Sequence, residues 1–496
     1  MRRREFIRAI GAAGMAFGGG CVGAGSPRAA DGKPRLALVG AGVQGRALLH
    51  HFLGQDLMVK GVCDCDAVRR ENRAKVVDDY YAQRGIAAPK AKRWADFRDV
   101  LADGEVDMVC VATPDHWHAY ITVEAMKAGK DVYCEKPLAY SVEESKLIMA
   151  AQEKYGRVLQ TGAMQRSATE FRTAAMIVRN GGIGQVKFVD CNFGGPSCPH
   201  RDYETPKNAA KEGAPNPDVD FDMWCGGAPL VKYSDRLAPR GVHNFFPMFW
   251  RNDDLFGLGM CGDWGAHHLD IAQWGLGLDD SGPVKIIRSN EPCSRNPFHG
   301  GRRQSGLQMV FADGCVLQHN PFSTWGVVFY GTEGIVAVNR DVFGVWRGKG
   351  GFPDETLRKK IADGSFDAMK CVAFWSPPNA GKGQPVPQPA ACSAKSLLDA
   401  CNKSIKEFEL RRAKVQLYKS LDHVSDFVAR CRDRKATCSP ASVGGRAAIL
   451  AQLCNISYVH DSGFGWDPAK NEFANGTGDS AWLSRPSYRK NWKVTT

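Results

Sequence analysis

The sequence predicts a two-domain α/β protein, with a doubly wound parallel sheet first and an α+β domain with an open, mainly antiparallel sheet after it. Three observations lead to this prediction. The chain has 496 residues, whereas a single hydrophobic core rarely serves more than about 250 to 300. Between residues 33 and 163, short apolar strands alternate with amphipathic helices, which is typical of a parallel sheet covered on both faces. From residue 164 onward this unit does not recur, and alternating apolar residues with Gly-rich turns replace it.

The first domain is expected over residues 33–163, and its strands are short apolar runs that a sheet buries on both faces. Its elements are, in order, the strand "PRLALVG", a helix over 43–53, the strand "LMVKGVCDCD", a helix over 67–85, the strand "VDMVCVATP", the helix "WHAYITVEAMKAG", the strand "KDVYCEKP", the helix "SVEESKLIMAAQEKYG" and the strand "RVLQTG".

The second domain is expected over residues 164–496. Its strand signals are stretches such as "LQMVFADGCVLQHN" and "WGVVFYGTEGIVAVNR", in which apolar residues alternate. A Pro-rich excursion over 376–395 follows, then helical sequence over about 396–434 and 444–460, and an irregular aromatic tail. We assign substrate binding and oligomerisation to this domain.

Composition and charge exclude several classes of protein. The formal charge is +12, but the basic residues are dispersed, so a nucleic-acid-binding face is not expected. No apolar run reaches the length of about 18 residues that spans a bilayer, so no integral membrane segment is expected. The 17 cysteines include no Cys-x-x-Cys pair, which argues against a metal site, and their disulfide pairing cannot be derived from the sequence.

The N-terminus "MRRREFIRAIGAAG" resembles a twin-arginine export signal, with consecutive arginines before Gly- and Ala-rich sequence of modest hydrophobicity. We therefore expect a signal peptide over residues 1–30 and a periplasmic or otherwise exported protein. The alternative is a frayed basic N-terminus. Lipid anchoring at Cys21 is not expected, because three glycines before the cysteine make a poor lipobox.

The stretch "GAGVQG" has the spacing of a dinucleotide-binding turn between a strand and a helix. Gly40 permits the sharp turn, Gly42 lets the backbone approach a pyrophosphate, and Gly45 lets helix and strand pack closely. Asp64 ends the second strand, where a carboxylate binds a ribose 2′-hydroxyl and repels a 2′-phosphate, so NAD is favoured over NADP. Arg69 and Arg70 are near enough to weaken that preference, and a solvated strand-end carboxylate is the alternative role for Asp64.

Three further motifs follow: "VATPDHWH", "YCEKPLA" and "GDWGAHHLDIAQW". Together with the glycine turn they resemble the Gfo/Idh/MocA oxidoreductases, which include glucose-fructose oxidoreductase and inositol dehydrogenases. The resemblance covers essentially the whole chain after the signal, and its exported, carbohydrate-active members are the most similar. It implies a nicotinamide cofactor, a small carbohydrate substrate and a homo-oligomer, dimer or tetramer. The region 345–415 is longer than in compact members, so the substrate cannot be transferred by analogy.

The resemblance assigns the catalytic roles to Lys136, Asp263 and His267. A lysine ammonium beside the nicotinamide would stabilise negative charge on the reacting oxygen. His267 would act as general acid and base, and Asp263, four residues before it and on the same face if the segment is helical, would orient the imidazole. The alternatives are a surface lysine, an N-cap aspartate and a structural histidine.

The other site residues also follow from the motifs and the resemblance. His116 and His118 of "DHWH" have no companion carboxylate-histidine motif, so we expect no metal there. In "HNFFPMFWRNDD", the candidate pocket residues are His243, Trp250 and Arg251, although an aromatic run is also typical of a core. The expected cofactor-binding residues are Gly40, Gly42, Val43, Gln44, Gly45, Asp64, Thr113, Pro114, His118, Glu135, Lys136 and Gln165, and the expected substrate-binding residues are Arg166, Trp250, Arg251 and His268.

The predicted function is hydride transfer between tightly bound NAD and a secondary hydroxyl of a sugar, sugar derivative or cyclitol. Two alternatives stay open: a glycosidase that uses NAD transiently by oxidation and elimination, and a non-catalytic sugar-binding relative. Export would strip a freely dissociating cofactor, so we expect NAD to be loaded before transport and retained.

Overall fold

The computed structural model describes residues 32–200, 215–246, 249–288, 306–319, 326–347, 394–420, 422–485, 487–489 and 491–496. The predicted signal peptide and residues 376–393 of the predicted excursion lie outside these ranges. In the described part of the chain, no helix is both long and apolar enough to span a membrane.

The N-terminal domain is built on a sheet of six parallel strands in the order β3-β2-β1-β4-β5-β6. The strands are β1 (Arg35–Val39), β2 (Met58–Cys63), β3 (Lys92–Trp94), β4 (Met108–Val111), β5 (Asp131–Cys134) and β6 (Leu159–Thr161). The order reverses between β1 and β4, and ligands of doubly wound sheets bind at such a point, outside the carboxyl ends of the strands. The predicted parallel sheet is therefore confirmed.

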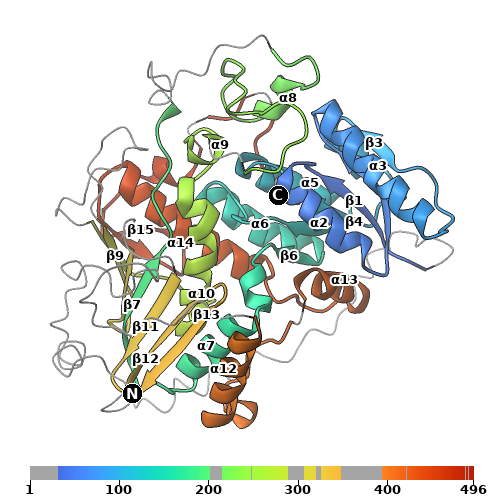
Figure 1. The fold of residues 1–496 in the computed structure, drawn as a ribbon. Coiled ribbons are helices and arrows are strands. Elements are labelled where there is room, and N and C mark those ends of the chain that lie inside the picture. The colour runs from blue at the N-terminus through green and yellow to red at the C-terminus, as the bar shows by residue number, and fades with distance from the viewer. Residues whose placement is uncertain are drawn as a thin grey trace.

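Helices cover both faces of this sheet (Figure 1). They are α2 (Val43–Leu53), α3 (Ala67–Gln83), α4 (Phe97–Ala102), α5 (Asp115–Lys127) and α6 (Val142–Tyr155). Apolar residues of α2 and α3 pack on one face, and those of α4, α5 and α6 pack on the other. The start of α6 follows from the sequence, because Ser141 and Glu144 form a capping box.

The second domain contains a nine-stranded sheet in the order β13-β12-β11-β7-β10-β9-β8-β14-β15. Among the described strands of this second sheet, only β7 and β10 pair in parallel. The sheet is therefore mainly antiparallel, as predicted. Its strands are β7 (Val186–Asn192), β8 (Lys285–Arg288), β9 (Leu307–Val310), β10 (Val316–His319), β11 (Gly326–Gly331), β12 (Gly334–Asn339), β13 (Val342–Arg347), β14 (Phe464–Asp467) and β15 (Glu472–Ala474).

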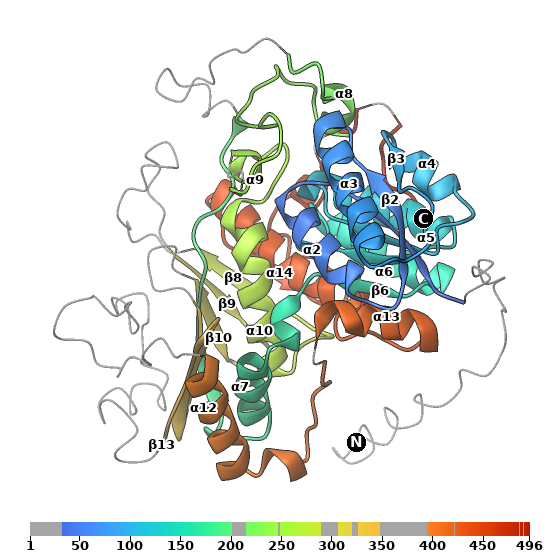
Figure 2. The ribbon, with the colours of Figure 1, turned by 45° about the vertical axis from the view of Figure 1, so that its right-hand side comes forward.

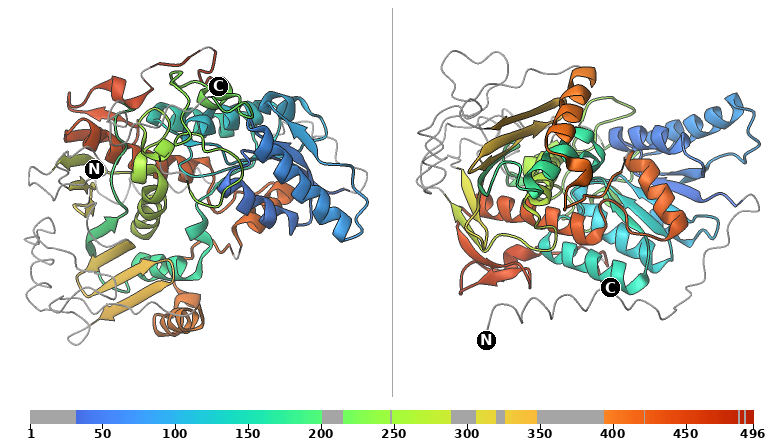
Figure 3. Two further views of the ribbon diagram at one scale, coloured as in Figure 1. Left: turned by 45° about the horizontal axis from the view of Figure 1, so that its top comes forward. Right: turned by 90° about the horizontal axis from the view of Figure 1, so that it is seen from below.

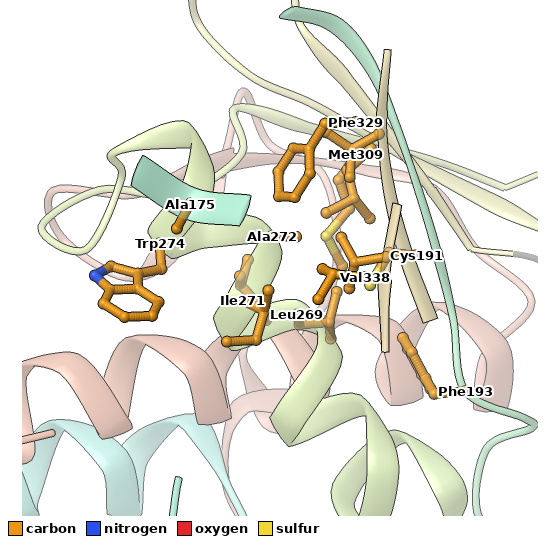
Figure 4. Packing of buried hydrophobic residues seen from close by; sticks show 14 of the residues in the cluster. Ala175, Cys191, Phe193, Leu269, Ile271, Ala272, Trp274, Met309, Phe329 and Val338 are labelled. Carbon is orange, nitrogen blue, oxygen red and sulfur yellow. The ribbon is translucent and has the colours of Figure 1, made fainter. Parts of the chain in front are cut away.

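Helices pack against one face of this second sheet (Figures 2 and 3). They are α7 (Thr169–Arg179), α10 (Ala266–Leu276), α12 (Ala394–Glu407) and α14 (Ala441–Val459). Leu269 and Ala272 of α10 meet Phe329 and Met309 of the sheet in the core (Figure 4). A Cβ at Gly275 would lie 2.4 Å from the Phe329 ring, so only glycine permits this close approach of α10. The core thereby fixes the segment that carries Asp263 and His267.

Segments near the C-terminus return to the first domain. The expected helix over 396–434 is two helices, α12 on the second sheet and α13 (His423–Asp433), whose Phe427 packs on the first sheet beside Phe52. The aromatic tail returns as well, since Trp492 packs edge-on against Trp117 at a centroid distance of 5.0 Å. The core of the first domain therefore includes residues far beyond residue 163.

Candidate active site

The three glycines of the turn differ in the space around them. Gly40 has a φ of +96°, and a Cβ there would lie 2.6 Å from the main chain of Ala112. A Cβ at Gly45 would lie 1.9 Å from the carbonyl oxygen of Gly40. In contrast, a Cβ at Gly42 meets no atom within 4 Å, and Gly42 lines a cleft at the start of α2. No side chain caps this helix, so its first N–H groups are available to a pyrophosphate.

Asp64 lies beside the turn at the end of β2. Its carboxylate accepts hydrogen bonds from the main-chain N–H groups of Ala41, at 2.6 Å, and Asp66, at 2.8 Å. Arg69 is directed elsewhere, with an ion pair to Asp66 at 3.3 Å, and Arg70 donates to the main-chain carbonyl of Asp64 at 2.6 Å. Neither arginine donates to the Asp64 carboxylate in the described structure, which keeps the site suited to a ribose 2′-hydroxyl.

A segment of the second domain lies along the same cleft. We define the strap as residues 237–246, of which Leu237, Ala238, Pro239, His243 and Phe246 line the cleft.

Two arginines of the first domain hold the strap. Arg46 of α2 donates to the side chain of Asn244, and Arg69 of α3 donates to the carbonyl oxygens of Pro239 and, at 3.2 Å, Gly241. The strap therefore joins the two domains beside the glycine turn.

A cluster of four charged side chains lines the other part of the cleft. Lys136 Nζ donates to the Asp263 carboxylate at 2.5 Å and to its main-chain carbonyl at 2.9 Å. Arg251 Nε lies 3.5 Å from the same carboxylate. Burial acts to raise the pKa of Asp263, but Lys136 and Arg251 outweigh it and hold this pKa below its usual value. Asp263 thus fixes the lysine ammonium in one position.

Asp115, at the first position of α5, is the fourth member of this cluster. Burial raises its pKa to about 7, although Arg251 and Lys136 act in the opposite direction. The carboxyl group therefore changes its charge near neutral pH. The sequence prediction does not include Asp115, because the motif indicates a metal pair only through its histidines and does not show that the aspartate is buried.

Residues at the start of α2 and residues that follow β4 and β5 line the cleft together. Gln44 donates to the buried Glu135 carboxylate at 2.9 Å, and burial raises the pKa of Glu135. Val43, Gln44, Thr113, Pro114, His118 and Glu135 all line the cleft. Thr113 Oγ1 is buried without a hydrogen-bond partner among the described residues. A buried hydroxyl group without a hydrogen-bond partner among the described residues, and the open space at Gly42, both fit a bound dinucleotide.

Main-chain carbonyl oxygens hold both histidines of "DHWH" in the described chain. His118 is buried between the carbonyl oxygens of Pro137, at 2.7 Å, and Thr113, at 2.9 Å. His116 contacts the carbonyl oxygen of Trp224 at 2.9 Å, and burial lowers its pKa to about 3. The described residues contain no cluster of three or more His, Cys, Asp or Glu side chains suited to a metal.

The expected pairing of Asp263 with His267 is wrong in its geometry. Residues Cys261–Gly265 form a π-helical turn, and α10 begins only at Ala266. The Asp263 carboxylate is engaged by Lys136 and Arg251, whereas His267 Nδ1 is buried without a hydrogen-bond partner among the described residues. Burial, with Lys136 and Arg340 next in effect, lowers the pKa of His267 far below its usual value. His267 is thus neutral at physiological pH, a form that can accept a proton.

The remaining predicted residues divide between the cleft and the core. Trp250 and Arg251 line the cleft, with the guanidinium 4.3 Å from the indole centroid. The carboxamide of Gln165 is buried and has no partner among the described residues. His268 contacts the Asn192 carbonyl oxygen at 2.7 Å inside the second domain.

Arg166 does not line the cleft. Its guanidinium forms a buried double ion pair with Asp270, at 2.8 Å, and Asp279, at 2.6 Å. The prediction of a substrate contact is corrected to a structural role, because the two carboxylates engage its nitrogens.

The class of the protein follows from this site. A glycine turn, a strand-end carboxylate and a fixed lysine meet at the carboxyl edge of a Rossmann sheet, with a second domain closing over them. This is the architecture of a dinucleotide-binding oxidoreductase.

Two family models match the chain. One describes the NAD-binding Rossmann fold of an oxidoreductase family and matches residues 35–163; the other describes the C-terminal α/β domain of that family and matches residues 202–332. The chain belongs to the Gfo/Idh/MocA oxidoreductase family, and its N-terminal domain is an NAD-binding domain.

Curated relatives match only part of the chain. Uncharacterised oxidoreductase YrbE of Bacillus subtilis is 34% identical over 128 residues, 24% of this chain and 38% of that protein. Inositol 2-dehydrogenase of Salmonella typhimurium is 30% identical over 175 residues, 35% of this chain and 49% of that protein. A glycosyl hydrolase family 109 protein of Shewanella woodyi is 28% identical over 158 residues, 31% of this chain and 32% of that protein. The chain thus spans half or less of each of these relatives.

Solved structures share the fold along most of the chain. The WlbA dehydrogenase of Chromobacterium violaceum, solved with NADH and UDP-GlcNAcA, has a TM-score of 0.53 at 14% identity and covers 89% of this chain and 98% of its own. The myo-inositol dehydrogenase of Lactobacillus casei, solved with NAD(H) and myo-inositol, has a TM-score of 0.50 at 16% identity and covers 91% of this chain and 100% of its own.

Proposed function

We propose that the protein moves a hydride between tightly bound NAD and a secondary hydroxyl of a sugar, sugar derivative or cyclitol. The observation that supports this most strongly is the ammonium of Lys136, fixed at 2.5 Å by Asp263 in the cleft that begins at the glycine turn. The inositol 2-dehydrogenases among its relatives suggest the substrate class.

Four residues have separate roles in the proposed hydride transfer. When NAD is bound, its nicotinamide supplies the hydride acceptor or donor. Lys136 donates a hydrogen bond to the reacting oxygen and stabilises the negative charge that develops on it. Asp263 holds Lys136 in place, and Arg251 contacts the same carboxylate. The resemblance to the family gives His267 the role of taking up the proton that the hydroxyl group releases and returning it in the reverse direction. Its imidazole is neutral, and its Nδ1 is buried without a partner among the described residues.

A second candidate is a glycosidase that oxidises a sugar hydroxyl transiently, eliminates the aglycone and reduces the product again. The relative in glycosyl hydrolase family 109 favours it. The cleft also offers an additional carboxyl group, Asp115, whose pKa burial raises to about 7. A non-catalytic sugar-binding role is less well supported, since Lys136 and Asp263 keep their ion pair.

A panel of sugars, cyclitols and aryl glycosides distinguishes these functions. Steady accumulation of NADH with a free sugar or cyclitol supports the dehydrogenase. Release of aglycone without net NADH supports the glycosidase, and neither signal with any compound would contradict both. Mass spectrometry of the purified protein then identifies the nicotinamide cofactor that it carries.

We further propose that the protein is exported by the twin-arginine route with NAD already bound, and that it assembles as a dimer or tetramer. Support for cofactor retention comes from the strap, which Arg46 and Arg69 fasten beside the glycine turn. The test is the NAD content of protein from the exported fraction, with light scattering for its mass. Protein that leaves the cell without NAD, or that loses NAD at once on dilution, would contradict retention.

A further inference from the structure

Arg340 is an exposed arginine that the sequence motifs did not single out. It lies in the turn between β12 and β13, where its N–H donates to Asn339 Oδ1 at 2.8 Å and Asp341 adopts a left-handed φ of 61°. This turn carries Arg340 beyond the end of the second sheet. The sheet therefore brings a side chain distant in sequence to the catalytic segment.

The Arg340 guanidinium lies over the face of Trp264, with its central carbon 4.4 Å from the ring centroid. Trp264 belongs to the π-helical turn that also carries Asp263. The charge of Arg340 contributes to lowering the pKa of His267, as that of Lys136 does. Arg340 and Lys136 thus act on the same imidazole from different domains.

No carboxylate of the described residues forms an ion pair with Arg340. The acids that influence it electrostatically are Asp263, Glu135, Asp341 and Glu170, but none of them lies within the 4.0 Å of a salt bridge in the described structure. Asp263 is already engaged by Lys136 and Arg251. An arginine held against an aromatic ring, without an acidic partner, can receive an anionic ligand with two hydrogen bonds.

We propose that Arg340 binds an anionic group of the substrate, and that the preferred substrates are sugar acids of the uronate class. This inference rests on the proposed function, because it places the anionic group of the sugar beside the segment that carries Asp263 and His267. The guanidinium is planar and can donate two parallel N–H hydrogen bonds to the two oxygens of a carboxylate. Its position over the indole ring of Trp264 fixes its orientation. Sulfate and phosphate esters of sugars also present anionic oxygens, as a carboxylate does. The experiment therefore tests them separately from the uronates.

The experiment measures the rate of NAD reduction over a range of sugar concentrations, with matched sugars that differ in the group at C6. The probes are D-glucose, D-glucuronate, D-galactose, D-galacturonate, D-glucose 6-sulfate and D-glucose 6-phosphate. We expect the uronates to exceed the matched neutral sugars in kcat/KM by at least about tenfold, which corresponds to about 1.4 kcal/mol. Arg340→Gln removes this preference, so that uronates and the matched neutral sugars are oxidised with similar efficiency, and Arg340→Lys keeps part of it.

Arg347→Gln is the matched control, because Arg347 is an exposed arginine at the other end of the same hairpin, 3.9 Å from Glu333. It should retain the preference of the wild-type protein. Equal turnover of uronates and neutral sugars, or a preference that survives Arg340→Gln, would overturn the inference and leave the proposed function intact. A preference for the sulfate or phosphate ester alone would overturn the uronate assignment. Reduction by none of the sugars would contradict the proposed function and the inference with it.

Discussion

Gly42 and Gly45 of the dinucleotide turn give opposite predictions for the stability of the protein when each is replaced by alanine. At Gly42, φ is −69° and a Cβ would meet no protein atom within 4 Å. Gly42→Ala should therefore fold normally, with the stability of the cofactor-free protein unchanged or raised by about 0.4 to 1 kcal/mol, because the unfolded chain loses entropy. The new methyl group occupies the space through which a pyrophosphate reaches the N–H groups of α2.

The expected loss of affinity follows from those hydrogen bonds. A methyl group prevents phosphate oxygens from reaching the usual distance of about 2.9 Å. Losing one or two hydrogen bonds to a charged group costs about 2 to 4 kcal/mol, or roughly 30- to 1,000-fold in Kd. The assay is the NAD content of the purified variant, the Kd for added NAD, and the free energy of unfolding of the cofactor-free protein.

Gly45→Ala is the control for this experiment. Its Cβ would lie 1.9 Å from the Gly40 carbonyl oxygen, so this variant should lose stability as well as cofactor. Wild-type affinity for NAD in Gly42→Ala would refute the placement of the pyrophosphate. Equal destabilisation of the two cofactor-free variants would refute the reasoning from close packing.

Three further predictions concern retention and pH. Arg69→Gln releases the strap and should speed NAD dissociation at least about tenfold in a stopped-flow measurement, whereas Arg84→Gln, an exposed arginine at the end of the same helix, should not. Oxidation of the sugar should rise with pH through about 7, because ionised Asp115 adds a negative charge to the cluster and so favours release of the hydroxyl proton, and an unchanged pH–rate profile in Asp115→Asn would exclude that contribution. Burial lowers the pKa of His116 and His319 to about 3, so the unfolded chain binds more protons between their folded pKa values and about 6.5. Each should therefore cost about 2 kcal/mol of stability between pH 7.5 and pH 5, and urea unfolding that is equally stable at both pH values would argue against this.

Much of the first domain was predictable, because its strands and helices are strongly patterned. The helix predicted over 43–53 has the bounds of α2, and the strands before and after it each begin one residue later than predicted. The edge strand β3 and the short helix α4 were missed. Residues Lys92–Trp94 are three residues with no apolar alternation, so only their pairing with β2 makes them a strand.

The catalytic cluster was predictable in part. The motif residues Lys136 and Asp263 do meet, because β5 and the π-helical turn end at the same cleft. The spacing of Asp263 and His267 fits several helical geometries, however, and the partners of Asp263 come from distant positions. Arg166 shows the same limit, since its ion pairs with Asp270 and Asp279 depend on packing between elements that no local pattern reports.

Single-turnover reduction of bound NAD in Lys136→Ala tests the proposed chemistry most directly. Lys136 is held by Asp263 rather than by the glycine turn, so the variant should still carry NAD when it is purified. Reduction of that NAD by a sugar substrate should slow by about 100-fold or more, as when one preorganised donor to a developing oxyanion is lost. A rate equal to that of the wild-type protein, in a variant with full NAD occupancy, would contradict the account.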